Sequence, residues 1–136
     1  MAGLLTTAAR QYLTGATSAV VNALVNADTP VSASQSAVEA LREPTMALET
    51  RALLDLMAAA ETTPALREAI RESTQTAERT LAQRISAWSP EAKDNYERAQ
   101  LVISLLDGLA IRAIVNPIND ALANRTRDTI LAIITE

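Results

Sequence analysis

The side chains that most often perform chemistry in proteins are largely missing from this sequence, which contains no Cys and no His. Without them the chain cannot form a disulfide, a Cys nucleophile, a His general base, or a zinc or haem site built from these residues. Carboxylates remain, with 16 Asp and Glu residues, but in the segments 64–88 and 90–115 their spacing places most of them on solvated helix faces. We therefore expect no catalytic residue, no metal ligand and no cofactor.

A second set of side chains could line a cavity for a small, mostly apolar ligand. Tyr12 and Trp88 each combine an apolar ring with a polar group, and Met46 and Met57 have flexible side chains that adapt to irregular space. Polar Thr side chains near the apolar stripes could orient such a ligand. The candidate ligand-binding residues are Tyr12, Met46, Thr50, Met57, Ile70, Thr74 and Trp88.

Each candidate also has an ordinary structural explanation. Trp88 and Tyr12 could pack at a helix end or at the edge of the core, and the two methionines could simply fill the core. The hydroxyl of a Thr inside a helix often donates a hydrogen bond to a carbonyl of its own helix. The sequence leaves these alternatives open.

Helices must position these residues, because apolar side chains recur at three- and four-residue spacing while alternating strand patterns are absent. Ala, which has the strongest helix preference, is the most frequent residue type. The five prolines divide the chain into six segments. We predict a single all-α domain over residues 1–136, with six helices at about 3–26, 31–42, 45–60, 64–88, 90–115 and 117–135.

Capping residues support several of these helix starts. Thr63, Ser89 and Asn116 each precede a proline, an arrangement that suits an N-cap followed by the first helical position. Ser32 and Gln35 have the spacing of a capping box. The sequence therefore predicts a helix beginning at or beside each of these positions.

Charged residues are distributed unevenly among the predicted helices. The first helix has only Arg10 in its body, so we expect it to be enclosed on more than one side. The fourth and fifth helices have solvated stretches in which ion pairs are expected at helical spacing. These pairs are Glu68 with Arg71 and Asp94 with Arg98.

The last two predicted helices have more apolar surface than one small bundle can cover. From Ala99 to Val115 the fifth helix is apolar around most of its circumference, and the sixth ends in the apolar run 129–134. Such surplus predicts a second copy, with two helices from each chain forming a four-helix interface. The candidate interface residues are Leu106, Gly108, Leu109, Ala113, Ile130, Ile133 and Ile134.

Polar or small residues interrupt this apolar stretch. Gly108 costs about 1 kcal/mol relative to Ala inside a helix, which indicates a close backbone approach, either across the subunit interface or within one subunit. Asp107 and Arg112 are five residues apart and do not share a helix face. We expect each to find a polar partner elsewhere, with Asp120 a candidate for Arg112; contact with a ligand is the alternative for either.

Composition also limits the partners. The net charge is −4 and aromatics make up 2% of the residues, so the chain lacks the basic surface and the stacking rings that nucleic-acid binding needs. The longest early stretch without charge, 11–27, contains too many polar residues to span a bilayer. No signal peptide is recognisable, and we expect a cytoplasmic protein with no membrane partner.

The stretch from Ala99 to Pro117, AQLVISLLDGLAIRAIVNP, resembles the penultimate helix of the tetracycline-repressor (TetR) family of bacterial transcription regulators. It contains a Leu-Leu-Asp-Gly-Leu core at 105–109, then a helix break and one closing helix, as in that family. The opening AGLLTTAARQYL is similar to the first helix after the family's DNA-binding head, and 46–85 fits its middle helices. The resemblance covers nearly the whole chain.

This resemblance implies the fold and function of the family's C-terminal domain, which binds a small effector and forms a homodimer. The family's three-helix head, with its helix-turn-helix, has no counterpart before Leu4, so Met1 is expected to be an artificial or alternative start. The chain as given should not bind DNA specifically, because DNA contact would need that head. An alternative is a headless interaction protein that heterodimerises with a full-length regulator. A small enzyme acting in a bundle cavity is a further alternative, with no recognisable nucleophile and base.

Overall fold

The computed structural model describes residues 19–136, which form helices and no strand. Residues 19–25 are helical, and five further helices follow. The all-α fold predicted from the spacing of apolar residues is confirmed. The helices are α2 (Pro30–Leu41), α3 (Met46–Ala60), α4 (Pro64–Trp88), α5 (Asn95–Ala113) and α6 (Asp120–Thr135).

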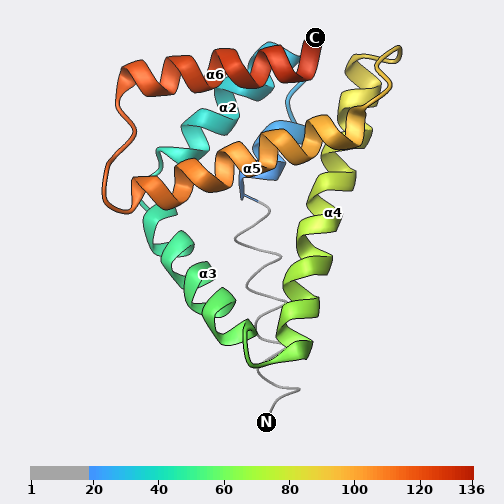
Figure 1. Ribbon diagram of the computed structural model, residues 1–136. Helices are drawn as coiled ribbons and strands as arrows, with labels where there is room; N and C mark the ends of the chain where they lie inside the picture. Colours follow the sequence, from blue (N-terminus) through green and yellow to red (C-terminus); the bar gives the residue numbers. More distant parts are fainter. Residues whose placement is uncertain (1–18) are drawn as a thin grey trace.

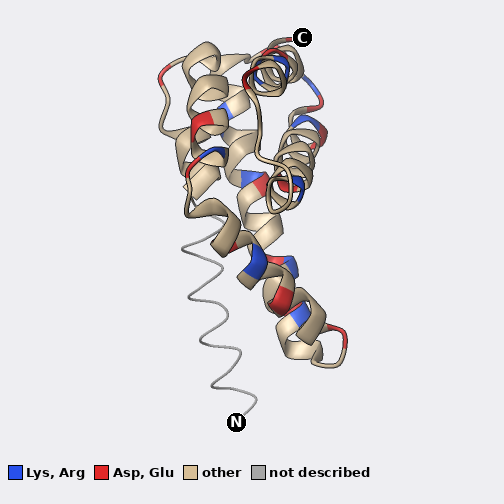
Figure 2. Ribbon diagram, turned by 90° about the vertical axis from the view of Figure 1, so that its left-hand side faces the viewer, with Lys and Arg blue, Asp and Glu red and all other residues tan. Residues whose placement is uncertain are grey.

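Three helices surround an interior space, and two others cover one end of the molecule. Figure 1 shows α3, α4 and α5 as the three sides of a triangle, with α3 and α4 meeting at the corner opposite α5. Helices α2 and α6 pack along each other beyond α5. Figure 2 shows basic and acidic residues interspersed along the described helices, without a large patch of one sign.

The first described cap differs from the prediction. Thr29 is the N-cap of α2: its hydroxyl accepts a hydrogen bond from the Ser32 backbone N–H at 3.1 Å, while the Ser32 hydroxyl accepts one from the Thr29 N–H at 3.2 Å. The capping box therefore joins Thr29 and Ser32, and the predicted box of Ser32 with Gln35 is wrong. Pro30 follows the cap at the first helical position, where its fixed φ fits and its missing N–H leaves no bond unmade.

The starts of α5 and α6 also lie later than predicted. A turn follows Ser89, in which the Ala92 N–H donates to the Ser89 carbonyl at 3.0 Å, and α5 begins only at Asn95. Asn119 rather than Asn116 caps α6, because its side chain accepts a hydrogen bond from the Leu122 N–H at 2.8 Å. In both connections a proline lies in the loop and not at the first helical position. The predicted starts at 90 and 117 are therefore wrong. Helix α4 begins at Pro64 as predicted, with Thr63 at the N-cap position, but the Thr63 side chain makes no capping hydrogen bond.

Most of the buried side chains belong to one core that joins the 19–25 segment, α2, α4, α5 and α6. Its largest fully enclosed members include Leu24, Leu81, Ile85, Ile130 and Ile134. A second, smaller cluster lies where α3 and α4 meet. That cluster consists of Ala60 and Leu66 with Leu56 and Ile70 packed against them.

Both predicted ion pairs are observed. Arg71 lies 2.6 Å from Glu68, and Arg98 lies 2.7 Å from Asp94. Arg98 also donates to the Ile133 carbonyl at 2.8 Å, which ties α5 to the end of α6.

The carboxylate of Asp120 does not pair with Arg112 as expected. It pairs at 2.8 Å with Arg42, directly after α2. This pair joins the end of α2 to the start of α6, because the two helices pack side by side. Both side chains are exposed, so the pair stabilises the fold by at most about 1 kcal/mol.

Candidate functional site

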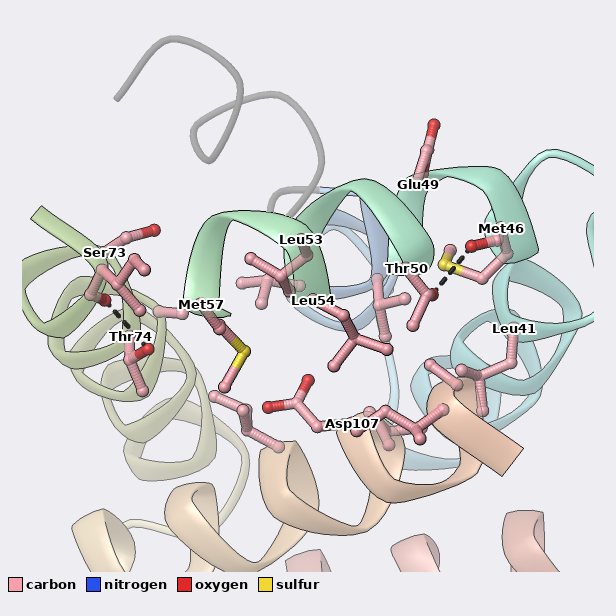
Figure 3. A pocket seen from close by; sticks show the side chains of 18 residues that line it. Leu41, Met46, Glu49, Thr50, Leu53, Leu54, Met57, Ser73, Thr74 and Asp107 are labelled. Carbon is pink, nitrogen blue, oxygen red and sulfur yellow. Dashed lines mark hydrogen bonds between the residues drawn. The ribbon is translucent and has the colours of Figure 1, made fainter. Parts of the chain in front are cut away.

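The interior space between α3, α4 and α5 contains a cavity of about 190 Å³. Apolar cavities of this order accept small organic molecules. Its lining is predominantly apolar, and the side chains of all three helices point into it in Figure 3. The described residues that line it are Val20, Val21, Leu41, Met46, Glu49, Thr50, Leu53, Leu54, Met57, Ile70, Ser73, Thr74, Ala77, Ile103, Leu106, Asp107, Ala110 and Ile111.

The structure brings most of the predicted ligand-binding residues together at this cavity. Five of them line it, namely Met46, Thr50 and Met57 on α3 and Ile70 and Thr74 on α4. Tyr12 lies outside the described residues. Contact of these side chains with a ligand stays a prediction.

The two threonines make the hydrogen bonds that Thr often makes inside a helix. Thr50 Oγ1 donates to the Met46 carbonyl at 2.7 Å, and Thr74 Oγ1 donates to the Ile70 carbonyl at 3.1 Å (Figure 3). Each hydroxyl hydrogen is therefore already used within its own helix. The oxygen lone pairs that remain can only accept a hydrogen bond from a ligand.

Trp88 lies away from the cavity, at the last position of α4. Its ring lies 5.2 Å from the Arg84 guanidinium, in the range of a cation–π contact, and it packs against the main core. Arg84 in turn donates to the Ala27 carbonyl at 2.7 Å. The Trp88 indole therefore helps to fix the end of α4 to the loop before α2, and we no longer propose it as a ligand contact.

Asp107, for which the sequence analysis expected a polar partner elsewhere and left contact with a ligand as the alternative, also lines the cavity. Figure 3 shows its carboxylate pointing from α5 into the space beneath α3, between Met57 and Leu54. Among residues 19–136 no hydrogen bond or ion pair is found for it. The sequence contained a signal for this position. Asp107 lies four residues after Ile103, three before Ala110 and four before Ile111, a spacing that places it on the same helix face as these apolar residues. All four line the cavity.

The surroundings of Asp107 favour its neutral form. Burial, and in second place the negative charge of Glu78 on α4, raise the pKa of this carboxyl from its ordinary value of 3.8 to about 6. Glu78 is itself buried, with 8% of its surface exposed and with Oε2 lacking a partner. No Lys or Arg occurs among the described lining residues. The site is thus apolar and negatively charged.

The raised pKa of Asp107 predicts a pH-dependent effect of Asp107→Asn on stability. A carboxyl that binds its proton more tightly in the folded state stabilises the fold fully below pH 3.8, and this contribution is lost as the pH rises through about 6. The variant should therefore be more stable than the unmodified chain at pH 7.5. We expect about 1 kcal/mol, well below the full shift, because the side chain stays exposed to the cavity.

Urea unfolding of both proteins between pH 4.5 and 7.5 measures this difference. Glu78, whose charge acts on Asp107, and Glu49, the other carboxylate among the lining residues, are kept unchanged. Asp55→Asn on the exposed side of α3 removes the same charge outside the cavity and should show no such trend. An Asp107→Asn variant that is less stable at pH 7.5 would mean that the carboxylate has a stabilising partner.

The residues predicted for a subunit interface divide into two groups. Leu106, Ile130 and Ile134 are buried inside the chain, so they pack in its core and offer no surface to a second copy. Gly108 is exposed, and a Cβ built on it would meet nothing within 4 Å. The predicted close approach within one subunit is therefore not found there. The remaining three, Leu109, Ala113 and Ile133, are half-buried at the edge of the core.

Of the last two helices, α5 has the more apolar exposed side. On α5, Leu101 is 59% exposed, and Val115, just after the helix, is 76% exposed. They lie with Leu105 and Gly108 along one side of α5, which we call the α5 outer face. The exposed positions of α6 are mostly polar, because its Ile130 and Ile134 are buried in the main core.

Within residues 19–136 no helix is long and apolar enough to cross a membrane. Residues 30–136 match the family model described as BetI-type transcriptional repressor, C-terminal. The matched part begins at the first residue of α2 and includes three walls of the cavity, α3, α4 and α5, and the α5 outer face. Neither the curated proteins nor the solved structures gave a match.

Proposed function

The chain belongs to the TetR family of transcription regulators as a BetI-type C-terminal domain, and from this membership we propose that it is a ligand-sensing and dimerising core. Domains of this family regulate and do not catalyse. The cavity between α3, α4 and α5 is the observation that supports sensing most directly. It is enclosed by three different helices, so a ligand in it contacts all three at once.

Sensing requires that the ligand binds one arrangement of these helices better than another. The energetic coupling between effector and DNA in such regulators is typically 1–3 kcal/mol, and it is reciprocal. Val20 and Val21 belong to the helical segment 19–25 and line the cavity, so contacts with a ligand extend to the most N-terminal described helix. In a protein with DNA-binding heads, a tilt of this helix would change the spacing of two heads that must lie about 34–36 Å apart.

The proposed homodimer uses the α5 outer face, with α6 beside it. Figure 1 shows α5 and α6 on the near side, where no described helix covers them. The apolar side chains Leu101, Leu105 and Val115 supply the centre of the interface, and the polar exposed positions of α6 supply its rim. This differs from the sequence-based expectation, in which both helices contributed apolar surface.

Hexanol is a suitable neutral probe for the cavity. It should raise the melting temperature of the chain by about 2 °C or more at millimolar concentration, because a ligand that binds only the folded state stabilises it. Ala110→Phe places a ring into the cavity and should abolish the shift. Ala58→Phe, an exposed position of α3 outside the lining, is the matched control and should leave the shift unchanged. Equal shifts in all three proteins would contradict a binding function for this cavity.

A further inference from the structure

The cavity combines an apolar lining with one inward-pointing carboxylate, and this combination restricts the chemistry of its ligand. Asp107 points into the cavity from α5 without a cationic partner among the described residues. A ligand that displaces water from this carboxylate must replace the lost hydrogen bonds, because a desolvated polar group without a partner is costly. The ligand therefore needs a hydrogen-bond donor at one end.

Negative charge around the donor position selects among possible ligands. Glu78 on α4 acts on Asp107 with a second negative charge from inside the protein. A fatty acid or another carboxylate would be repelled by both groups, and no described Lys or Arg in the lining offsets that repulsion. A neutral alcohol could donate one hydrogen bond but would leave the charge of Asp107 uncompensated.

The kind of cation is restricted as well. A quaternary ammonium ion has no N–H and is usually held by aromatic rings. The described lining contains no aromatic side chain. A protonated amine, by contrast, donates N–H groups to a carboxylate in a charge-assisted hydrogen bond, which is stronger than a neutral one.

We propose that the ligand of this cavity is a hydrophobic amine, whose ammonium group donates hydrogen bonds to Asp107 and whose hydrocarbon part lies among Leu53, Leu54 and Ile103. This inference rests on the proposed ligand-sensing function and adds the chemical class of the ligand. Alkyl amines are protonated at neutral pH, as the Lys side chain is. Met57, beside Asp107 in Figure 3, adapts its shape to amines of different width.

Four probes that share a six-carbon chain separate the contributions of charge and of hydrogen-bond donors to binding. They are hexylamine, hexanol, hexanoate and hexyltrimethylammonium. Isothermal titration at pH 7.5 should give hexylamine a Kd about tenfold to a hundredfold lower than that of hexanol, the range for a hydrogen bond to a charged group. Hexanoate should bind more weakly than hexanol. Hexyltrimethylammonium should bind at least about tenfold more weakly than hexylamine, because it lacks the N–H donors.

The variant Asp107→Asn removes the charge with little change in shape and should reduce the preference for hexylamine over hexanol to about twofold or less. Asp55→Asn, outside the cavity, should keep the full preference. Far-UV circular dichroism shows whether both variants are folded.

The outcomes distinguish this inference from the function on which it rests. Binding of hexanol and hexylamine with equal affinity overturns the amine inference but leaves the ligand-sensing function standing. An unchanged amine preference in Asp107→Asn, tighter binding of hexanoate, or equal binding of the quaternary ion likewise overturns it. If no hexyl compound binds to the unmodified chain, both proposals fail.

Discussion

A Gly108→Arg variant is expected to be monomeric at micromolar concentrations at which we expect the unmodified chain to form the proposed dimer. Gly108 lies on the α5 outer face, and a Cβ added there meets nothing within 4 Å inside the chain. The new side chain therefore does not disturb the fold of one subunit, and the helix gains up to about 1 kcal/mol from the loss of Gly. In the proposed dimer, however, it places an unpaired charge in an apolar interface.

The expected loss of dimer affinity follows from the cost of burying that charge. An uncompensated buried charge costs about 3–5 kcal/mol, which corresponds to at least a hundredfold increase in the dimer dissociation constant. Analytical ultracentrifugation over a concentration series measures this constant. Urea unfolding of the same samples shows whether the subunit itself is still stable.

Ala58→Arg is the matched control, since it adds the same charge at an exposed position of α3. It should leave the dimer intact. Gly108→Ala tests the close approach itself: it should stabilise the helix in a monomer but weaken a dimer in which two backbones meet at this residue. A Gly108→Arg protein that stays dimeric, or an unmodified chain that is monomeric, would contradict an interface on the α5 outer face.

The helices were predictable because their signals are local. Apolar spacing and Thr63 before Pro64 set the bounds of α4 correctly. The same prediction, an N-cap residue followed by a proline at the first helical position, was wrong at Ser89 and Asn116. There the loop folds into a turn before the helix begins. A Ser or Asn before a proline fits a turn as well as a cap. At the start of α5 the Asn95 side chain donates a hydrogen bond of 2.7 Å to the hydroxyl of Ser86 on α4, a contact that the dipeptide does not reveal.

The site was predictable only in part, because a helical pattern does not show which neighbour covers each side. Met46, Thr50 and Met57 share a helix face, so the structure places them in the cavity together. The apolar character of Ile130 and Ile134 was recognised, but both are buried in the main core of the chain, where α6 packs beside α2, and are not available to a second copy. The local sequence does not reveal that α2 packs on α6, and so it could not show that these side chains are buried within one chain.

Leu66→Ala should lower the free energy of unfolding by about 3 kcal/mol, the usual cost of truncating a fully enclosed Leu. Leu66 is 0% exposed and is the largest fully buried member of the small cluster where α3 and α4 meet. The melting temperature should fall by about 10 °C for a domain of this size. Leu48→Ala, at a position of α3 that is 72% exposed, is the control and should change the free energy by less than about 0.5 kcal/mol.

The loss of Leu66 should act most strongly on α3, because this helix has the fewest attachments. Only Met46, Thr50 and Ala60 are buried among its residues, and Ala60 belongs to the cluster around Leu66. Amide hydrogen exchange should therefore lose more protection in α3 than in α6, which packs on α2 and the main core. Since α3 is one wall of the cavity, hexanol should also bind more weakly to this variant. Equal loss of protection in both helices would mean that α3 unfolds only together with the whole domain, and a movable α3 could then not take part in sensing.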